Sequence, residues 1–114
     1  TTSNNSRAKI DHNIAMLEKE RERNQLQQDV QQAHADAVAA ERSFEAANLA
    51  LDAMSQNFTN AEKRFEQDMI NTVDFNDAKS RLAVARTQAI RAKYEYIFRL
   101  TIIDFYMGKP INLQ

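Results

Sequence analysis

The stretch RFEQDMINTVDFNDAK, residues 64–79, separates two long helical patterns and contains neither glycine nor proline. Those two residues mark most helix ends, so this corner needs another explanation. Asn71 suits the N-cap of a second helix, because its side chain can accept a hydrogen bond from a free backbone amide. Asp74, three residues later, adds a carboxylate at the positive helix end. Asp68 tolerates the left-handed conformation that ends many helices. The stretch therefore predicts a turn between two helices, with its tip at residues 66–73.

Apolar residues on both sides of this corner recur at alternating spacings of three and four, which is typical of coiled-coil helices. The stripe before the corner consists of Leu26, Val30, Ala33, Ala37, Ala40, Phe44, Ala47, Leu51, Met54, Phe58, Ala61 and Phe65. The stripe after it consists of Phe75, Ala78, Leu82, Ala85, Ala89, Ala92, Tyr96, Leu100 and Ile103. When the chain is folded at the corner, the numbers of facing residues from Phe65 with Phe75 to Phe44 with Tyr96 add up to 139 or 140. The two stripes therefore share one antiparallel register.

This register predicts an all-α fold, a long antiparallel helical hairpin with unequal arms at about residues 7–67 and 72–107. The larger side chains expected along the seam are Phe44, Leu51, Met54, Phe58, Phe75, Leu82 and Tyr96. The first arm would be about 90 Å long at 1.5 Å per residue. It also carries a short earlier stripe, Ile10, Ile14 and Leu17, and the step from Leu17 to Leu26 breaks the repeat. We therefore expect the helix to change partner or path there.

Both ends of the chain differ from the helical pattern. Residues 1–6, TTSNNS, are small and polar and predict a disordered or linking start. Gly108 suits the position after a helix, and Pro110 follows where helices do not continue. Residues 109–114 are thus expected to be a C-terminal extension of a single hairpin domain spanning residues 7–108. Because the sequence does not start with methionine, we expect it to be a piece of a longer protein.

Composition and motifs disfavour several functions. The 114 residues include 15 basic and 16 acidic residues, well mixed, which is no footprint for nucleic acid. No apolar run approaches the roughly 20 residues of a membrane span. His12 and His34 are isolated and complete no metal-binding motif. The sequence contains no nucleophile–base arrangement and no phosphate loop, so we expect neither an enzyme nor a cofactor.

The corner resembles the tip signature of TolC-type outer-membrane efflux proteins. The resemblance rests on Arg64-Phe65, Ile70-Asn71, Asp74-Phe75, Asp77-Ala78-Lys79 and Leu82. Residues 92–98 and 104–110 are similar to the end of the last coiled-coil helix of this family, and residues 23–26 to its preceding long helix. The resemblance covers nearly all of residues 7–113. At Asp68 this chain departs from the glycine that the family usually has, so we expect the turn to be more strained or differently shaped.

The resemblance implies a homotrimeric channel of the cell outer membrane, with a barrel in the membrane and a helical tunnel across the periplasm. This chain would form part of the tunnel wall in the periplasm, as a non-enzymatic segment of an efflux or type I secretion system. Its tip would face a periplasmic adaptor (a membrane fusion protein) and an inner-membrane pump. Asp74 and Asp77 would line the channel entrance. The adaptor-contacting tip would consist of Arg64, Phe65, Asp68, Met69, Ile70 and Asn71.

Simpler interpretations exist for these features. In the alternative interpretation, Asp74 only caps the second helix, and Met69 and Ile70 only pack across the turn. A small-residue stripe (Ala35, Ala39, Ser43, Ala46, Ala50 and Ala53) would let a neighbouring helix approach, or reflects helix propensity alone. The chain as a whole is alternatively a coiled-coil scaffold that mediates protein association. A third alternative is the hairpin of the adaptor itself, which is disfavoured because the glycine- and valine-rich lipoyl-like motifs are absent.

The end of the second helix is apolar nearly all round, with Tyr94, Tyr96, Phe98, Phe105 and Tyr106. Such a surface would be buried against other parts of a whole protein, or would lie at a membrane interface. If those parts are missing, the surface is exposed and favours self-association. For the isolated chain we therefore expect an antiparallel dimer that forms a four-helix assembly.

Overall fold

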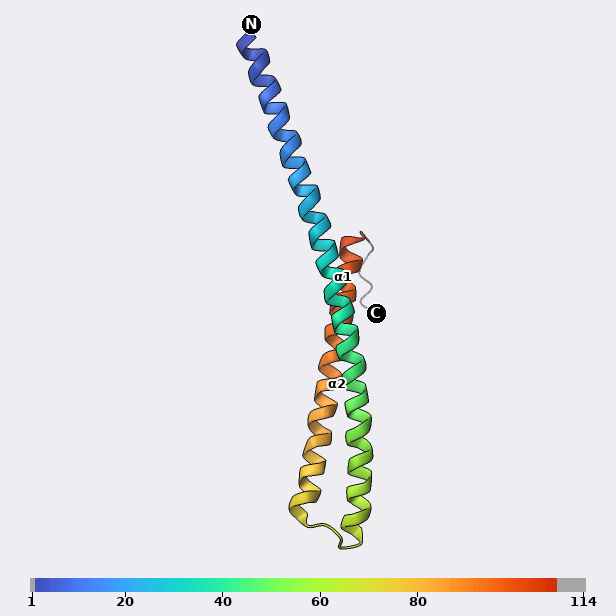
Figure 1. Cartoon of the computed structure of the whole chain (residues 1–114). Helices are drawn as coiled ribbons and strands as arrows, with labels where there is room; N and C mark the ends of the chain where they lie inside the picture. Colours follow the sequence, from blue (N-terminus) through green and yellow to red (C-terminus); the bar gives the residue numbers. More distant parts are fainter. Residues whose placement is uncertain (1, 109–114) are drawn as a thin grey trace.

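The computed structural model describes residues 2–108, which form two antiparallel helices joined by a short turn (Figure 1). Helix α1 spans Thr2–Glu66 and helix α2 spans Thr72–Tyr106. The described chain is a rod whose extents are 99 × 27 × 15 Å. The prediction of an all-α hairpin with unequal arms is confirmed.

Of the two helix ends away from the turn, one differs from the expectation and the other agrees with it. Helix α1 already begins at Thr2, so the disordered start expected for residues 1–6 is wrong for residues 2–6. Serine, threonine and asparagine only modestly disfavour a helix, and extending an existing helix costs little per residue. At the other end Gly108 adopts a φ of 73°, the left-handed conformation expected of it. Residue 1, Pro110 and the expected C-terminal extension, residues 109–114, lie outside the described residues.

A narrow seam holds the two helices together, and alanine supplies most of its fully buried residues. The buried side chains of the described chain are Ala33, Ala37, Ala40, Ala61, Ala78, Leu82, Ala85 and Ala89. All of them lie on the two predicted stripes. Phe44, Leu51, Met54, Phe58, Phe75 and Tyr96 lie along the same line and are half-buried. Alanine lets helix backbones approach closely, but each alanine removes little apolar surface from water.

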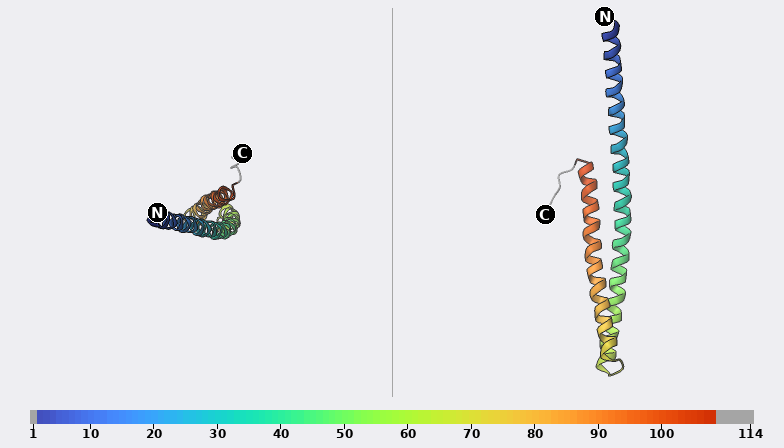
Figure 2. Two further views of the ribbon diagram at one scale, coloured as in Figure 1. Left: turned by 90° about the horizontal axis from the view of Figure 1, so that it is seen from above. Right: turned by 90° about the vertical axis from the view of Figure 1, so that its left-hand side faces the viewer.

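Helix α1 extends far beyond the end of α2, as both views show (Figures 1 and 2). Residues 2–28, here called the overhang, are all exposed, and Asp29 and Val30 are the first half-buried residues. Ile10, Ile14 and Leu17 are 57%, 49% and 59% exposed. Leu26 was expected in the seam but is also exposed, because α2 ends at Tyr106 before reaching its level. The short N-terminal stripe thus has no partner within the described chain.

The rod exposes much more surface than a compact protein of its size. Its accessible surface is 9573 Å² for a mass of 13.1 kDa. A compact monomer of that mass would expose about 6,400 Å². Within residues 2–108, neither helix combines the length and the apolar character needed to cross a membrane.

Phe75 is the residue on which we expect the hairpin to depend most, because its ring contacts two rings of α1. Phe75→Ala should lower the free energy of unfolding by about 2 kcal/mol, less than for a fully buried phenylalanine because the ring is half-exposed. Phe105→Ala is the matched control, since Phe105 is 67% exposed and its ring pairs with no ring of α1 among the described residues. Urea denaturation followed by circular dichroism at one protein concentration measures both. Equal effects of the two substitutions would contradict this assignment.

Candidate functional site at the hairpin tip

Helix α1 ends in a hydrogen-bonded turn that normally contains glycine. The Met69 N–H donates to the Arg64 carbonyl at 2.8 Å, and the Asp68 N–H donates to the Phe65 carbonyl at 3.1 Å. These two bonds are those of a Schellman motif, which pairs the last free carbonyls of a helix. Asp68 occupies the left-handed position with a φ of 57°. The aspartate thus occupies a backbone conformation that has a steric cost for any residue other than glycine.

Helix α2 begins immediately after this turn with a side-chain cap. Asn71 has an extended backbone, with φ −85° and ψ 171°, and its Oδ1 accepts a hydrogen bond from the Asp74 N–H at 2.8 Å. No bond in the opposite direction, from the Asn71 N–H to the Asp74 carboxylate, is present among the described residues. The cap is therefore one half of a capping box, and the Asp74 carboxylate remains exposed.

Three phenylalanine rings join the two arms next to the turn. The centroids of Phe65 and Phe75 lie 4.5 Å apart with an interplanar angle of 15°, so these rings stack. Phe58, on the preceding heptad of α1, lies 5.6 Å from the same Phe75 ring. The facing pair Phe65 and Phe75 is therefore in contact as the register predicts, and the cluster clamps the ends of both helices beside the tip.

One face of the tip forms an open recess of about 330 Å³. It is lined by Asn57, Asn60, Ala61, Arg64, Ile70, Asp74, Asp77, Ala78 and Arg81. The structure thus brings together the expected entrance residues Asp74 and Asp77 with two expected tip residues, Arg64 and Ile70. This recess, which is mostly polar, is referred to below as the tip recess.

The other expected tip residues lie outside the tip recess. Phe65 belongs to the ring cluster, and Asp68 and Asn71 build the turn. Met69 is 62% exposed at the outer end of the rod, whereas Ile70 is half-buried and lines the recess. Two adjacent apolar residues thus differ, since Ile70 packs locally and Met69 is free to contact another molecule.

Arg81 is a member of the tip recess that we did not single out from the sequence. Its Nε lies 2.9 Å from Oδ2 of Asp77, one helical turn earlier. The Asp77–Arg81 spacing of four residues could have indicated this pair. Both side chains are more than half exposed, so the pair is screened by water, and it partly neutralises the charge of Asp77.

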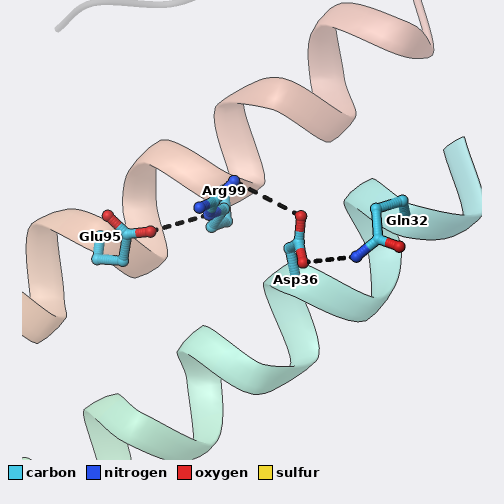
Figure 3. Close-up of polar contacts among 4 residues, drawn as sticks. All are labelled: Gln32, Asp36, Glu95 and Arg99. Carbon is cyan, nitrogen blue, oxygen red and sulfur yellow. Dashed lines mark hydrogen bonds and ion pairs between the residues drawn. The ribbon is translucent and has the colours of Figure 1, made fainter. Parts of the chain in front are cut away.

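A second polar cluster, also not foreseen, links the helices near the end of α2 (Figure 3). Arg99 lies between Glu95, at 2.9 Å on its own helix, and Asp36 of α1, at 3.6 Å. Gln32 donates to Asp36 at 2.9 Å. The predicted stripe placed Leu100 at this level, but Leu100 is 41% exposed and Arg99 is half-buried. Arg99 therefore takes the half-buried place where the stripe put Leu100, while Ala33 and Ala37 of α1 remain buried beyond it.

These features provide contact surfaces of defined shape and charge. Within residues 2–108, no group of three or more histidine, cysteine, aspartate or glutamate side chains is placed to hold a metal ion. A scan against models of protein families and searches of curated proteins and of solved structures found no match to this chain.

The left-handed Asp68 gives the tip a simple test. Asp68→Gly should raise the free energy of unfolding by about 1 kcal/mol, because glycine adopts a positive φ without steric cost. Asp52→Gly, at an exposed position within α1, is the control and should lower it by roughly 0.3 kcal/mol, because aspartate is itself a poor helix former. Thermal denaturation followed by circular dichroism compares the two. A loss of stability in Asp68→Gly would mean that the aspartate side chain itself stabilises the turn.

Proposed function

We propose that this chain is a periplasmic helical hairpin of a TolC-type outer-membrane channel subunit. In this proposal the hairpin forms part of the tunnel wall in a homotrimer, and its tip contacts the adaptor of a tripartite efflux or type I secretion system. The supporting observation is the corner between Arg64 and Leu82. The residues that resemble the family signature there are those that end α1, cap α2 and stack across the turn.

The shape of the hairpin supports a structural role of this kind. A tunnel wall requires long, stiff helices whose outer faces accept neighbouring helices. Helix α1 carries small, exposed residues such as Ala39, Ser43 and Ala46 beside its seam. The surface that remains exposed is large for the mass of the chain, as expected of a segment that is covered by neighbours in a larger assembly.

The acidic residues of the tip recess would form rings at the channel entrance under three-fold symmetry. In the full-length trimer, Asp77→Asn should raise by about tenfold the cation concentration that is needed to block half of the conductance. Three exposed carboxylates that each contribute roughly 0.5 kcal/mol to cation binding account for this factor. Conductance across a planar bilayer measures the block. Asp104→Asn, at the far end of α2, is the control, and an unchanged block in Asp77→Asn would refute the ring.

Met69 provides the corresponding test of the adaptor contact. Met69→Glu in the full-length protein should abolish co-purification of the adaptor, because a carboxylate would replace an exposed apolar side chain at the contact. Leu49→Glu is the matched control, since Leu49 is 73% exposed and lies on α1 away from the tip. Retention of the adaptor by Met69→Glu would count against the contact.

A coiled-coil scaffold remains the second candidate, and the exposed apolar stripe of the overhang favours it. Sequencing the complete gene that encodes this segment would distinguish the channel from the scaffold. A channel subunit should contain a secretion signal, amphipathic strands before this segment, and an earlier copy of the corner. A frame with further helical repeats and none of these three features would replace the channel with a scaffold.

A further inference from the structure

One face of the hairpin carries a shallow groove along most of its length. Four separate recesses lie on this face, among them the tip recess, and their lining residues follow spacings of three and four on each helix. The middle of this lateral groove is lined by Asp36, Ala39, Ser43 and Ala50 of α1, and by Val84 and Gln88 of α2. Small side chains thus leave room along α1 between the two helices.

The unpartnered stripe of the overhang faces the same side of α1 as this groove. Ile10, Ile14 and Leu17 precede Ala39, Ser43 and Ala46 by the same interval, 29 residues. Eight turns of an α-helix take about 28.8 residues, so the two sets differ by only about 20° of rotation. Because α1 is uninterrupted from Thr2 to Glu66, a partner on this side would contact both.

We propose that two copies of this chain associate in antiparallel orientation, with the overhang of each lying in the lateral groove of the other. The branched side chains of Ile10, Ile14 and Leu17 would fill the space above Ala50, Ala46 and Ser43 of the second copy. The lengths agree, since the overhang spans about 40 Å and α1 from residue 29 to 66 spans about 57 Å. The two hairpins then lie end to end with their tips outward.

Charges are complementary in this arrangement. With Ile14 beside Ala46 of the second copy, Asp11 comes close to Arg91 on α2 of that copy. Arg21 comes close to Asp36 on its α1. Arg91 forms no ion pair with any residue of the described chain, and it is exposed beside the groove. The overhang thus presents opposite charges to both helices that it would contact.

The buried area would suffice for a stable dimer. A helix about 40 Å long and about 10 Å wide covers about 400 Å² on each side of a contact. Two such contacts, counted on both partners, bury about 1,600 Å² in total, which is the size of a typical stable interface. The dimer contains four helices, and it is proposed for this chain alone, independently of any role in a channel.

A charge exchange tests the arrangement. The chain should sediment as a dimer at micromolar concentration, and Asp11→Arg should weaken association by about tenfold. Arg91→Asp alone should have the same effect, and the double variant should restore the affinity. Asp52→Arg, which changes an exposed charge of α1 away from the groove, is the control and should leave association unchanged. All three positions are exposed helix residues, so circular dichroism should show unaltered helix content.

Disulfide formation tests the register, since the natural chain contains no cysteine. A mixture of Ile14→Cys and Ala46→Cys should form a disulfide between the two variants on mild oxidation. A mixture of Ile14→Cys and Asn48→Cys should not, because residue 48 lies about 200° around the helix from residue 46. A chain that stays monomeric at high concentration would overturn the proposal. It would also be overturned if the double charge variant did not regain affinity, or if Ile14→Cys formed a disulfide with residue 14 of a second Ile14→Cys chain.

Discussion

The hairpin depends on the alignment of two apolar stripes, and the few large side chains in the seam hold that alignment. Alanine fills most of the fully buried positions and would pack equally well after a shift of one heptad. The stacked rings at the corner do not allow such a shift, since Phe75 lies between Phe58 and Phe65 at centroid distances of 5.6 and 4.5 Å. Farther from the tip, Phe44 and Tyr96 stack at 5.8 Å in the same register. The aromatic contacts thus specify the register of the two helices, whereas the alanines are compatible with more than one register.

The corner itself shows how a turn forms without glycine. Two backbone bonds close α1 and one side-chain bond opens α2, so several of the free polar groups at these helix ends find partners within a few residues. Closing the turn requires a positive φ at Asp68, which strains the backbone of an L-residue. Strain of this kind persists where the surrounding contacts over-determine the backbone, and here the ring cluster lies directly beside it.

A seam this thin leaves most of both helices facing solvent. The surplus of accessible surface relative to a compact monomer is a property of the elongated shape, and it explains why both proposals concern other chains. The channel and the dimer would use one surface in common, since both place a helix against Ala39, Ser43 and Ala46 of α1. The outer end of the tip, at Met69, would serve only the channel, and the overhang stripe would serve only the dimer.

The sequence by itself determined the fold class, the register of the seam and the chemistry of the corner. Each of these depends on periodic spacing or on residues within a few positions of one another, as with the Asn71 cap, so a linear pattern carries the information. Only the tertiary structure decided where pairing stops, because the exposure of Leu26 follows from the end of α2 and not from its own neighbours. It also decided that Ile70 turns into the tip recess while Met69 faces outward, and that Arg99 takes the half-buried place expected for Leu100. These outcomes depend on side chains from two helices meeting in space, and the spacing within either helix does not encode them.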